Sequence, residues 1–114
     1  MAVLVGKPAP DFHCPAVLGN GDIVSDFHLA SVIRGKYALL FFYPLDFTFV
    51  CPSELIALDH RMADFTARGV EVISVSIDSH FTHNAWRNTA IENGGIGAVQ
   101  YTMAADLTQQ IARD

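Results

Sequence analysis

Cysteine is scarce in this sequence. Only Cys14 and Cys51 occur among the 114 residues. Two cysteines do not make the framework of disulfides that holds small secreted domains together. In a reducing compartment, two such residues indicate core packing, metal binding or catalysis. The question is which of these uses applies to each cysteine.

Basic residues are also few, with 7 Lys and Arg against 12 Asp and Glu and a net charge of -5. No basic cluster is present that could bind phosphates, which argues against a nucleic acid or an anionic membrane as partner. No apolar run reaches the roughly 18 residues of a membrane-spanning helix. The N-terminus has no basic region before its short apolar stretch and no small-residue cleavage site after it. We therefore expect no signal peptide and a cytoplasmic location.

Apolar residues, in contrast, are abundant. The hydrophobic fraction is 51% and the charged fraction 17%, a balance that excludes intrinsic disorder. The length favours one domain over residues 1–114.

The segment 37–69 organises the chain. Residues 37–43 form an apolar run of strand length, and Pro44 cannot continue its ladder because it lacks an N–H donor. A helix is predicted over 51–68, ended by Gly69, with an apolar stripe at helical spacing formed by Leu55, Leu58, Met62 and Phe65. Residues 70–77 are β-branched and predict a second strand. Together they predict a right-handed βαβ unit with parallel strands.

The flanking regions predict further elements. Residues 19–22 indicate the tip of a hairpin with arms at 12–18 and 22–24, followed by one helical turn over 31–34. Asp78 and Ser79 can cap a helix over 80–92.

Two apolar anchors, Phe81 and Trp86, are expected in that helix, and Trp86 is expected in the core. A loop at 93–97 and a strand over 99–103 follow. A last helix is predicted from 107, with Leu107 and Ile111 on one face. A βαβ unit needs further strands and helices to cover its sheet, so we expect the front part of a larger α/β domain.

Cys51 lies between the predicted buried strand and the first helical turn. A free thiol ionises near pH 8.5, and the partial positive charge and unpaired N–H groups of a helix N-terminus lower that value. A reactive thiolate is one interpretation, and a packed small hydrophobic residue is the other. A thioredoxin-type pair would need a second cysteine where Glu54 stands, and no histidine shows a local hydrolase signature. The residues alone leave the two interpretations open.

The pattern Pro44-x-x-x-Thr48-x-x-Cys51 resembles the active-site motif of the peroxiredoxins. It is most similar to the typical two-cysteine subgroup, which includes bacterial alkyl hydroperoxide reductases. Segments 6–12, 75–83, 85–86 and 94–97 also match the family in order and spacing, so the resemblance covers nearly the whole chain. It implies an α/β thioredoxin-like fold of the peroxiredoxin type, incomplete at the C-terminus.

The resemblance also implies roles for individual residues. The Cys51 thiolate would attack hydrogen peroxide or an alkyl hydroperoxide and become a sulfenic acid. Thr48 and the Cys51 N–H would bind the peroxide, Pro44 would shield the sulfur, and Glu54 would help to hold an arginine. No metal or organic cofactor takes part. In the family a cysteine of a partner subunit resolves the sulfenic acid, a thioredoxin-like or dedicated reductase completes the cycle, and the subunits form dimers or rings of dimers.

The sequence departs from the family in two respects. None of the five arginines matches the catalytic position, and Cys14 lies too early to be the usual resolving cysteine. We therefore expect the 114-residue polypeptide to fold marginally and to reduce peroxide poorly. The alternative function is that of a weak or inactive fragment, an interaction or holdase-like protein that uses its uncovered apolar surface.

A small polar cluster, Asp78, His80 and His83, follows the strand 70–77. A metal site there is conceivable, but no further ligand is evident, and solvated or interface residues are the preferred interpretation. Interface or core positions are expected for Phe42, Phe47 and Phe81.

Overall fold

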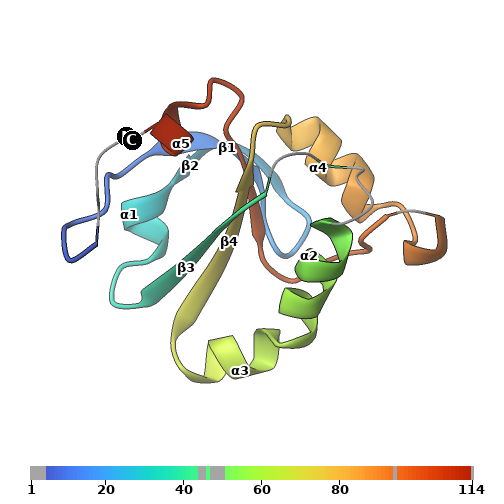
Figure 1. The fold of residues 1–114 in the computed structure, drawn as a ribbon, viewed down its shortest axis with the longest axis horizontal. Coiled ribbons are helices and arrows are strands. Elements are labelled where there is room, and N and C mark those ends of the chain that lie inside the picture. The colour runs from blue at the N-terminus through green and yellow to red at the C-terminus, as the bar shows by residue number, and fades with distance from the viewer. Residues whose placement is uncertain (1–4, 44–45, 47–50, 94, 114) are drawn as a thin grey trace.

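The computed structural model describes residues 5–43, 46, 51–93 and 95–113, with the backbone alone at 51–53. Its described residues form one mixed sheet in the order β2-β1-β5-β4-β3 (Figure 1). The strands are β1 His13–Val17, β2 Ile23–His28, β3 Tyr37–Phe42, β4 Val70–Ser76 and β5 Thr102–Ala105. The helices are α1 Leu29–Val32, α2 Cys51–His60, α3 Met62–Ala67, α4 His80–Arg87, the 3₁₀ turn η1 Ile91–Asn93 and α5 Gln110–Arg113.

The predicted βαβ unit is confirmed. Strands β3 and β4 run parallel, in a register that pairs Tyr37 with Val70 and Phe42 with Val75. Strand β5 continues the sheet in parallel with β4, whereas β1 is antiparallel to both β5 and β2. The sheet is therefore mixed, and helices cover both of its faces (Figure 1).

The predicted helix over 51–68 is two helices. It is interrupted at Arg61, whose N–H bonds to the carbonyl of Leu58, three residues back instead of four. The tighter turn redirects the chain, and the predicted apolar stripe still packs in one cluster. Gly69 adopts φ +69° after α3 and donates its N–H to Thr66, which confirms the predicted C-cap.

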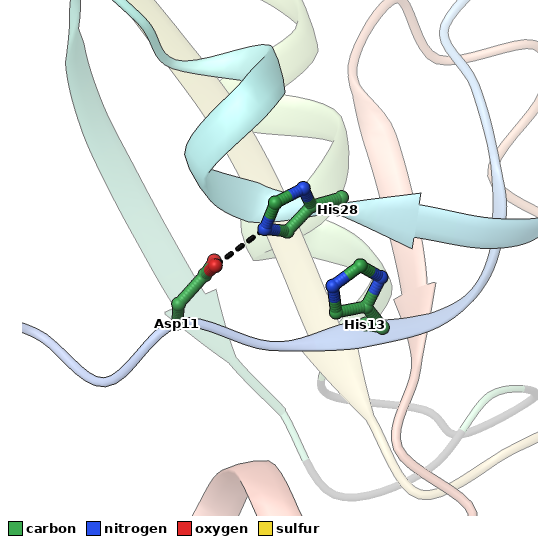
Figure 2. Close-up of side chains that lie close together, drawn as sticks. All are labelled: Asp11, His13 and His28. Carbon is green, nitrogen blue, oxygen red and sulfur yellow. Dashed lines mark hydrogen bonds and ion pairs between the residues drawn. The ribbon is translucent and has the colours of Figure 1, made fainter.

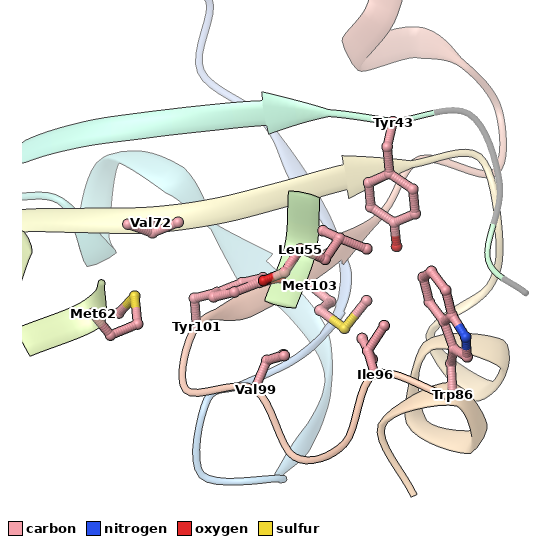
Figure 3. Close-up of a cluster of buried hydrophobic side chains, with 9 residues drawn as sticks. All are labelled: Tyr43, Leu55, Met62, Val72, Trp86, Ile96, Val99, Tyr101 and Met103. Atoms are coloured by element: carbon pink, nitrogen blue, oxygen red, sulfur yellow. The ribbon is translucent and has the colours of Figure 1, made fainter. Parts of the chain in front are cut away.

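The sheet has one cluster of buried apolar residues on each of its two faces. The side facing α2, α3 and α4 holds Tyr43, Leu55, Met62, Val72, Trp86, Ile96, Val99, Tyr101 and Met103 (Figure 3). The side facing α1 and α5 holds Phe12, Cys14, Ala16, Phe27, Leu29, Ile73, Val75 and Ala104. Neighbouring residues Val72 and Ile73 of β4 serve opposite clusters, as the alternation of side chains in a strand requires. Trp86 is fully buried, which confirms its predicted place in the core.

Several predicted boundaries were wrong. The hairpin is present, but β2 extends to His28 instead of ending at 24, and β5 starts three residues later than predicted. Helix α4 ends at Arg87, short of the predicted 92. After it the chain turns so closely that a Cβ atom on Gly95 would lie 1.9 Å from the Thr89 carbonyl oxygen.

The predictions for Phe81 as an apolar anchor and for Leu107 as the start of the last helix were also wrong. Phe81 is 68% exposed, because the buried face of α4 is formed by His83, Trp86 and Arg87, and Phe81 lies off that face. Leu107 is 56% exposed and precedes the last helix. The Asp106 carboxylate accepts hydrogen bonds from the N–H groups of Ile111 and Ala112, so α5 starts only after Leu107.

Strand β3 was predicted to be buried, but it is the edge strand of the described sheet. Its apolar side chains are exposed: Tyr37 by 77%, Phe42 by 50% and Leu39 by 37%. An open apolar groove of about 550 Å³ adjoins it, lined by Phe42, Tyr43, Val75, Ser76, Ile77, Asp106 and Ala112. Within the described part of the chain, no helix has the length and apolar character needed to cross a bilayer.

Candidate active site

Cys51 is the first residue of α2, which follows β3 in the βαβ unit. The backbone therefore has the predicted order of strand, connection and helix start at this cysteine. Three other predicted residues, Pro44, Phe47 and Thr48, lie outside the described residues, as does the Cys51 side chain. Their predicted contacts with the thiol stay predictions. Glu54 lies in the first turn of α2 and is exposed to solvent.

Asp46, which lies between β3 and α2 in the sequence, has a buried carboxylate. Asp46 accepts a hydrogen bond from the Tyr43 hydroxyl at 2.5 Å, and its Oδ2 lies 2.6 Å from Nδ1 of His83. Burial, reinforced by the charge of Asp46, raises the pKa of Tyr43, so its hydroxyl stays protonated and can donate. The side chains of Asp46 and His83 are both fully buried. Asp46 is thus tied to the end of β3 and to α4.

Both ring nitrogens of His83 face acceptors. Nε2 lies 3.0 Å from the carbonyl oxygen of Ala104, which can only accept, so Nε2 carries a hydrogen. The contact between Nδ1 and the Asp46 carboxylate also needs a proton between its two atoms. The pair therefore forms a hydrogen bond that is shielded from water, and a low-dielectric interior strengthens such a bond.

The backbone N–H of Asp46 is also hydrogen-bonded. It donates to Oδ2 of Asp78 at 2.6 Å, at the junction between β4 and α4. The next residue, Ser79, is the N-cap of α4, and its hydroxyl accepts from the Thr82 N–H at 3.1 Å, as predicted for this capping position. Asp46 is therefore held by Tyr43 at the end of β3, by Asp78 after β4 and by His83 of α4.

This network corrects the interpretation of His83 as a solvated or interface residue. His83 is fully buried, so it is neither solvated nor an exposed interface residue, and both its nitrogens are engaged. Within the described residues, the side chains of Asp78, His80 and His83 do not form a group that could hold a metal ion. No local pattern in the sequence indicates this pairing, because Asp46 and His83 lie 37 positions apart.

Helix α2 is also held at two points further along. The Tyr101 hydroxyl donates to the Leu55 carbonyl at 2.9 Å, and Oδ1 of Asp59 accepts from the Gln100 N–H at 2.7 Å. Burial raises the pKa of Tyr101, so its hydroxyl keeps the hydrogen that it donates. The segment before β5 thus fixes the position of the helix that carries Cys51.

Arg87 is a buried guanidinium with a structural task. Nη2 donates to the carbonyl oxygens of Val99 at 2.7 Å and Gly19 at 3.0 Å, and burial lowers the pKa of the group. It therefore fastens the hairpin tip to the segment before β5. The second cysteine, Cys14, is a free thiol packed in the core, and burial raises its pKa to about 11. A thiol in that state is a poor nucleophile at neutral pH.

Comparison with known proteins gives one consistent family. The model of the AhpC/TSA family matches residues 5–114. Alkyl hydroperoxide reductase C of Helicobacter pylori (strain ATCC 700392 / 26695) is 54% identical over 112 residues, 98% of this chain and 57% of that protein. Peroxiredoxin-2 of Pongo abelii is 48% identical over 110 residues, 96% of this chain and 60% of that protein. The chain thus spans somewhat more than half the length of these curated relatives.

Solved structures agree with these relatives. The reduced 2-Cys peroxiredoxin of Plasmodium vivax superposes with a TM-score of 0.93 at 47% identity, covering 98% of this chain and 68% of that one. The predicted α/β thioredoxin-like fold of the peroxiredoxin type is confirmed by this match.

Proposed function

Because the chain belongs to the AhpC/TSA family, we propose that it is a thiol-dependent peroxidase whose reactive group is the Cys51 thiolate. Its substrates are hydrogen peroxide and alkyl hydroperoxides. The names of its relatives, alkyl hydroperoxide reductase C and peroxiredoxin, support this class of substrate. The alternative, an interaction or holdase-like protein, is not favoured, because the matched family is one of peroxidases.

In the proposed reaction, the Cys51 sulfur donates an electron pair to the terminal oxygen of the hydroperoxide. An S–O bond forms and the O–O bond breaks, so the sulfur is oxidised to sulfenic acid. The leaving oxygen takes the electron pair and a proton and departs as an alcohol or as water. The step needs an ionised thiol, because the thiolate is the nucleophile.

One observation carries the proposal: α2 begins at Cys51, shortly after the buried and hydrogen-bonded Asp46 in the sequence. The first N–H groups of a helix have no partner within the helix, and they carry a partial positive charge that favours a thiolate. In the proposal, Thr48 and the Cys51 N–H bind the peroxide, and Pro44 keeps water from the sulfur. Glu54 helps to hold an arginine.

The buried network around Asp46 has a supporting part in the proposal. A catalytic group acts well only when its surroundings hold it within a fraction of an ångström of the productive geometry. Tyr43, Asp78 and His83 hold Asp46, which lies between Pro44 and Thr48 in the sequence. We assign these three residues a positioning role, since none of them is proposed to touch the peroxide.

The proposal includes partners. The sulfenic acid is resolved by a cysteine of a second subunit, and a thioredoxin-like or dedicated reductase reduces the resulting disulfide. The subunits act as dimers or as rings of dimers, and no metal or organic cofactor enters the cycle. A chemistry that returns to free thiols after each turnover fits a cytoplasmic, reducing location. The net charge of -5 argues against a nucleic acid as partner.

We also propose that residues 1–114 belong to a single larger domain whose sheet continues beyond β3. The support is the exposed apolar character of that edge, with Tyr37 at 77% and Phe42 at 50% exposure beside the apolar groove. An exposed apolar edge strand invites pairing with another strand. A neighbouring strand would cover it and hydrogen-bond its free backbone groups.

Trapping of the sulfenic acid tests the proposal, because this first step needs no resolving cysteine. The reduced chain receives one equivalent of hydrogen peroxide in the presence of dimedone, and the adduct is located by peptide mass spectrometry. We expect the label on Cys51, no label in Cys51→Ser, and full labelling of Cys51 in the control Cys14→Ser. A label confined to Cys14, or no label at all, would reject the proposed role of Cys51.

A further inference from the structure

Two histidines face each other across the hairpin β1–β2. His13 and His28 are register partners, so their side chains project from the same face of the sheet. Their imidazole rings are nearly parallel, with centroids 4.0 Å apart and planes 11° apart (Figure 2). The hairpin thereby holds two nitrogen ligands next to each other without any help from a loop.

Asp11 brings a carboxylate to the same place. Its Oδ1 accepts hydrogen bonds from the N–H groups of Phe12 at 2.9 Å and Ala30 at 3.0 Å, and its Oδ2 contacts Nε2 of His28. The backbone bonds fix the carboxylate, and the other oxygen points at the imidazole (Figure 2).

The other ring nitrogens are held from outside the cluster. Nδ1 of His13 lies 2.7 Å from Oδ1 of Asp26, and Nδ1 of His28 lies 2.8 Å from the Ser31 hydroxyl. When Nδ1 donates its hydrogen to such a group, Nε2 keeps a free lone pair, the usual arrangement around metal-binding histidines. A hydroxyl can donate or accept, so Ser31 can pair with either tautomer of His28.

We propose that Asp11, His13 and His28 bind a divalent transition-metal ion of the zinc class, with Asp26 and Ser31 orienting the two imidazoles. One ligand atom from each of the three residues lies within 4.8 Å of the other two, and in the described part of the chain no other such group occurs. Two imidazole nitrogens and one carboxylate oxygen suit borderline ions such as Zn²⁺, with water in the remaining position.

The geometry also predicts what changes when the ion binds. Zn²⁺ bonds to nitrogen and oxygen at about 2.0–2.2 Å. The Asp11 oxygen and the His28 nitrogen, which now contact each other directly, must therefore move apart to admit the ion between them. The ion replaces the Asp11–His28 contact, and the rings turn out of their stack so that each lone pair points at it. Solvent can deliver the ion, because the side chains of His13, Asp11 and His28 are 57%, 46% and 31% exposed.

The proposed site is separate from Cys51. It lies on β1 and β2, at one edge of the described sheet, whereas α2 follows β3 at the opposite edge. The metal site and the thiol chemistry can therefore be tested independently of each other.

Zinc titration followed by NMR tests the site directly. The ¹⁵N-labelled chain, kept reduced by a phosphine, is titrated with Zn²⁺ at pH 7.5, and the histidine ring nitrogens are followed in long-range ¹H–¹⁵N spectra. We expect saturation at one equivalent, with changes at Nε2 of His13 and His28 and none at His60, His80 or His83. The inference is overturned if no saturable binding occurs, or if the ring nitrogens of His13 and His28 do not respond.

Substitutions of the proposed ligands provide a second test of the zinc site. His13→Gln and His28→Gln are expected to weaken zinc binding by more than about 10-fold, and Asp26→Asn by about 10-fold, as for other groups that orient a ligand. The control His60→Gln, which changes an exposed histidine at the end of α2, is expected to leave binding unchanged. If His60→Gln weakens binding as much as His13→Gln, or if only Cys51→Ser abolishes it, the site does not exist.

Discussion

The substitution His83→Ala tests the anchor of the connection that precedes Cys51. The change removes a ring that is fully buried and that contacts Asp46 at 2.6 Å and the Ala104 carbonyl at 3.0 Å. Asp46 would be left as a buried carboxylate that has lost its proton-sharing partner. Removing one member of a buried pair costs about 3–5 kcal/mol.

That loss is large for a chain of this size. Domains are stable by about 5–15 kcal/mol, so a loss of about 3–5 kcal/mol in His83→Ala is at least about a fifth of the total stability. At about 2–8 °C per kcal/mol, the unfolding temperature should fall by at least about 6 °C.

Urea unfolding followed by tryptophan fluorescence measures the effect. Trp86 is the single tryptophan, it is fully buried, and its ring centroid lies 6.0 Å from that of Tyr43, beside the network. The matched control is His60→Ala, which removes an exposed histidine and should change stability by no more than about 0.5 kcal/mol. The double variant Asp46→Asn/His83→Ala should lose less stability than the sum of the losses in the two single variants, by about 0.5–3 kcal/mol. A loss below about 1 kcal/mol in His83→Ala would refute the reasoning.

Three further predictions concern the core, a close approach and the catalytic cycle. Leu55→Ala removes a fully buried side chain from α2 and should lower the unfolding free energy by about 2–5 kcal/mol in the same urea assay, whereas a loss under about 1 kcal/mol would show that Leu55 is not a core residue. Gly95→Ala places a Cβ atom 1.9 Å from the Thr89 carbonyl oxygen, so we expect a loss of about 1–3 kcal/mol, and unchanged stability would contradict that packing. In a steady-state peroxide-consumption assay, the 114-residue polypeptide should turn over slowly even with a thioredoxin-like reductant, and a rate equal to that of a full-length relative would contradict this.

The local parts of the fold were predictable from the sequence. The βαβ unit, the Gly69 cap, the Ser79 cap and the apolar stripe of α2 and α3 depend on residues close together in the chain, and each was found as expected. The active-site motif around Cys51 also led directly to the family that the comparisons show.

What depends on distant residues was missed. Strand β3 has the composition of a buried strand, but composition cannot tell which strand of a sheet has a free edge. The apolar character of Phe81 predicts an anchor, but α4 instead buries His83 and Arg87, whose polar groups bond to residues far away in the sequence. The stacking of His13 on His28 requires the register of the hairpin, which the sequence pattern did not define.

The pH dependence of alkylation at the two cysteines tests the central claim most directly. The rates of iodoacetamide modification are measured separately for Cys51 and Cys14 by peptide mass spectrometry between pH 4 and pH 11. We predict that the Cys51 rate rises between pH 5 and pH 7 and then levels off, since the start of α2 favours the thiolate. The Cys14 rate should rise only as the pH approaches its pKa of about 11. A Cys51 midpoint near 8.5, the value of an ordinary thiol, would contradict the account.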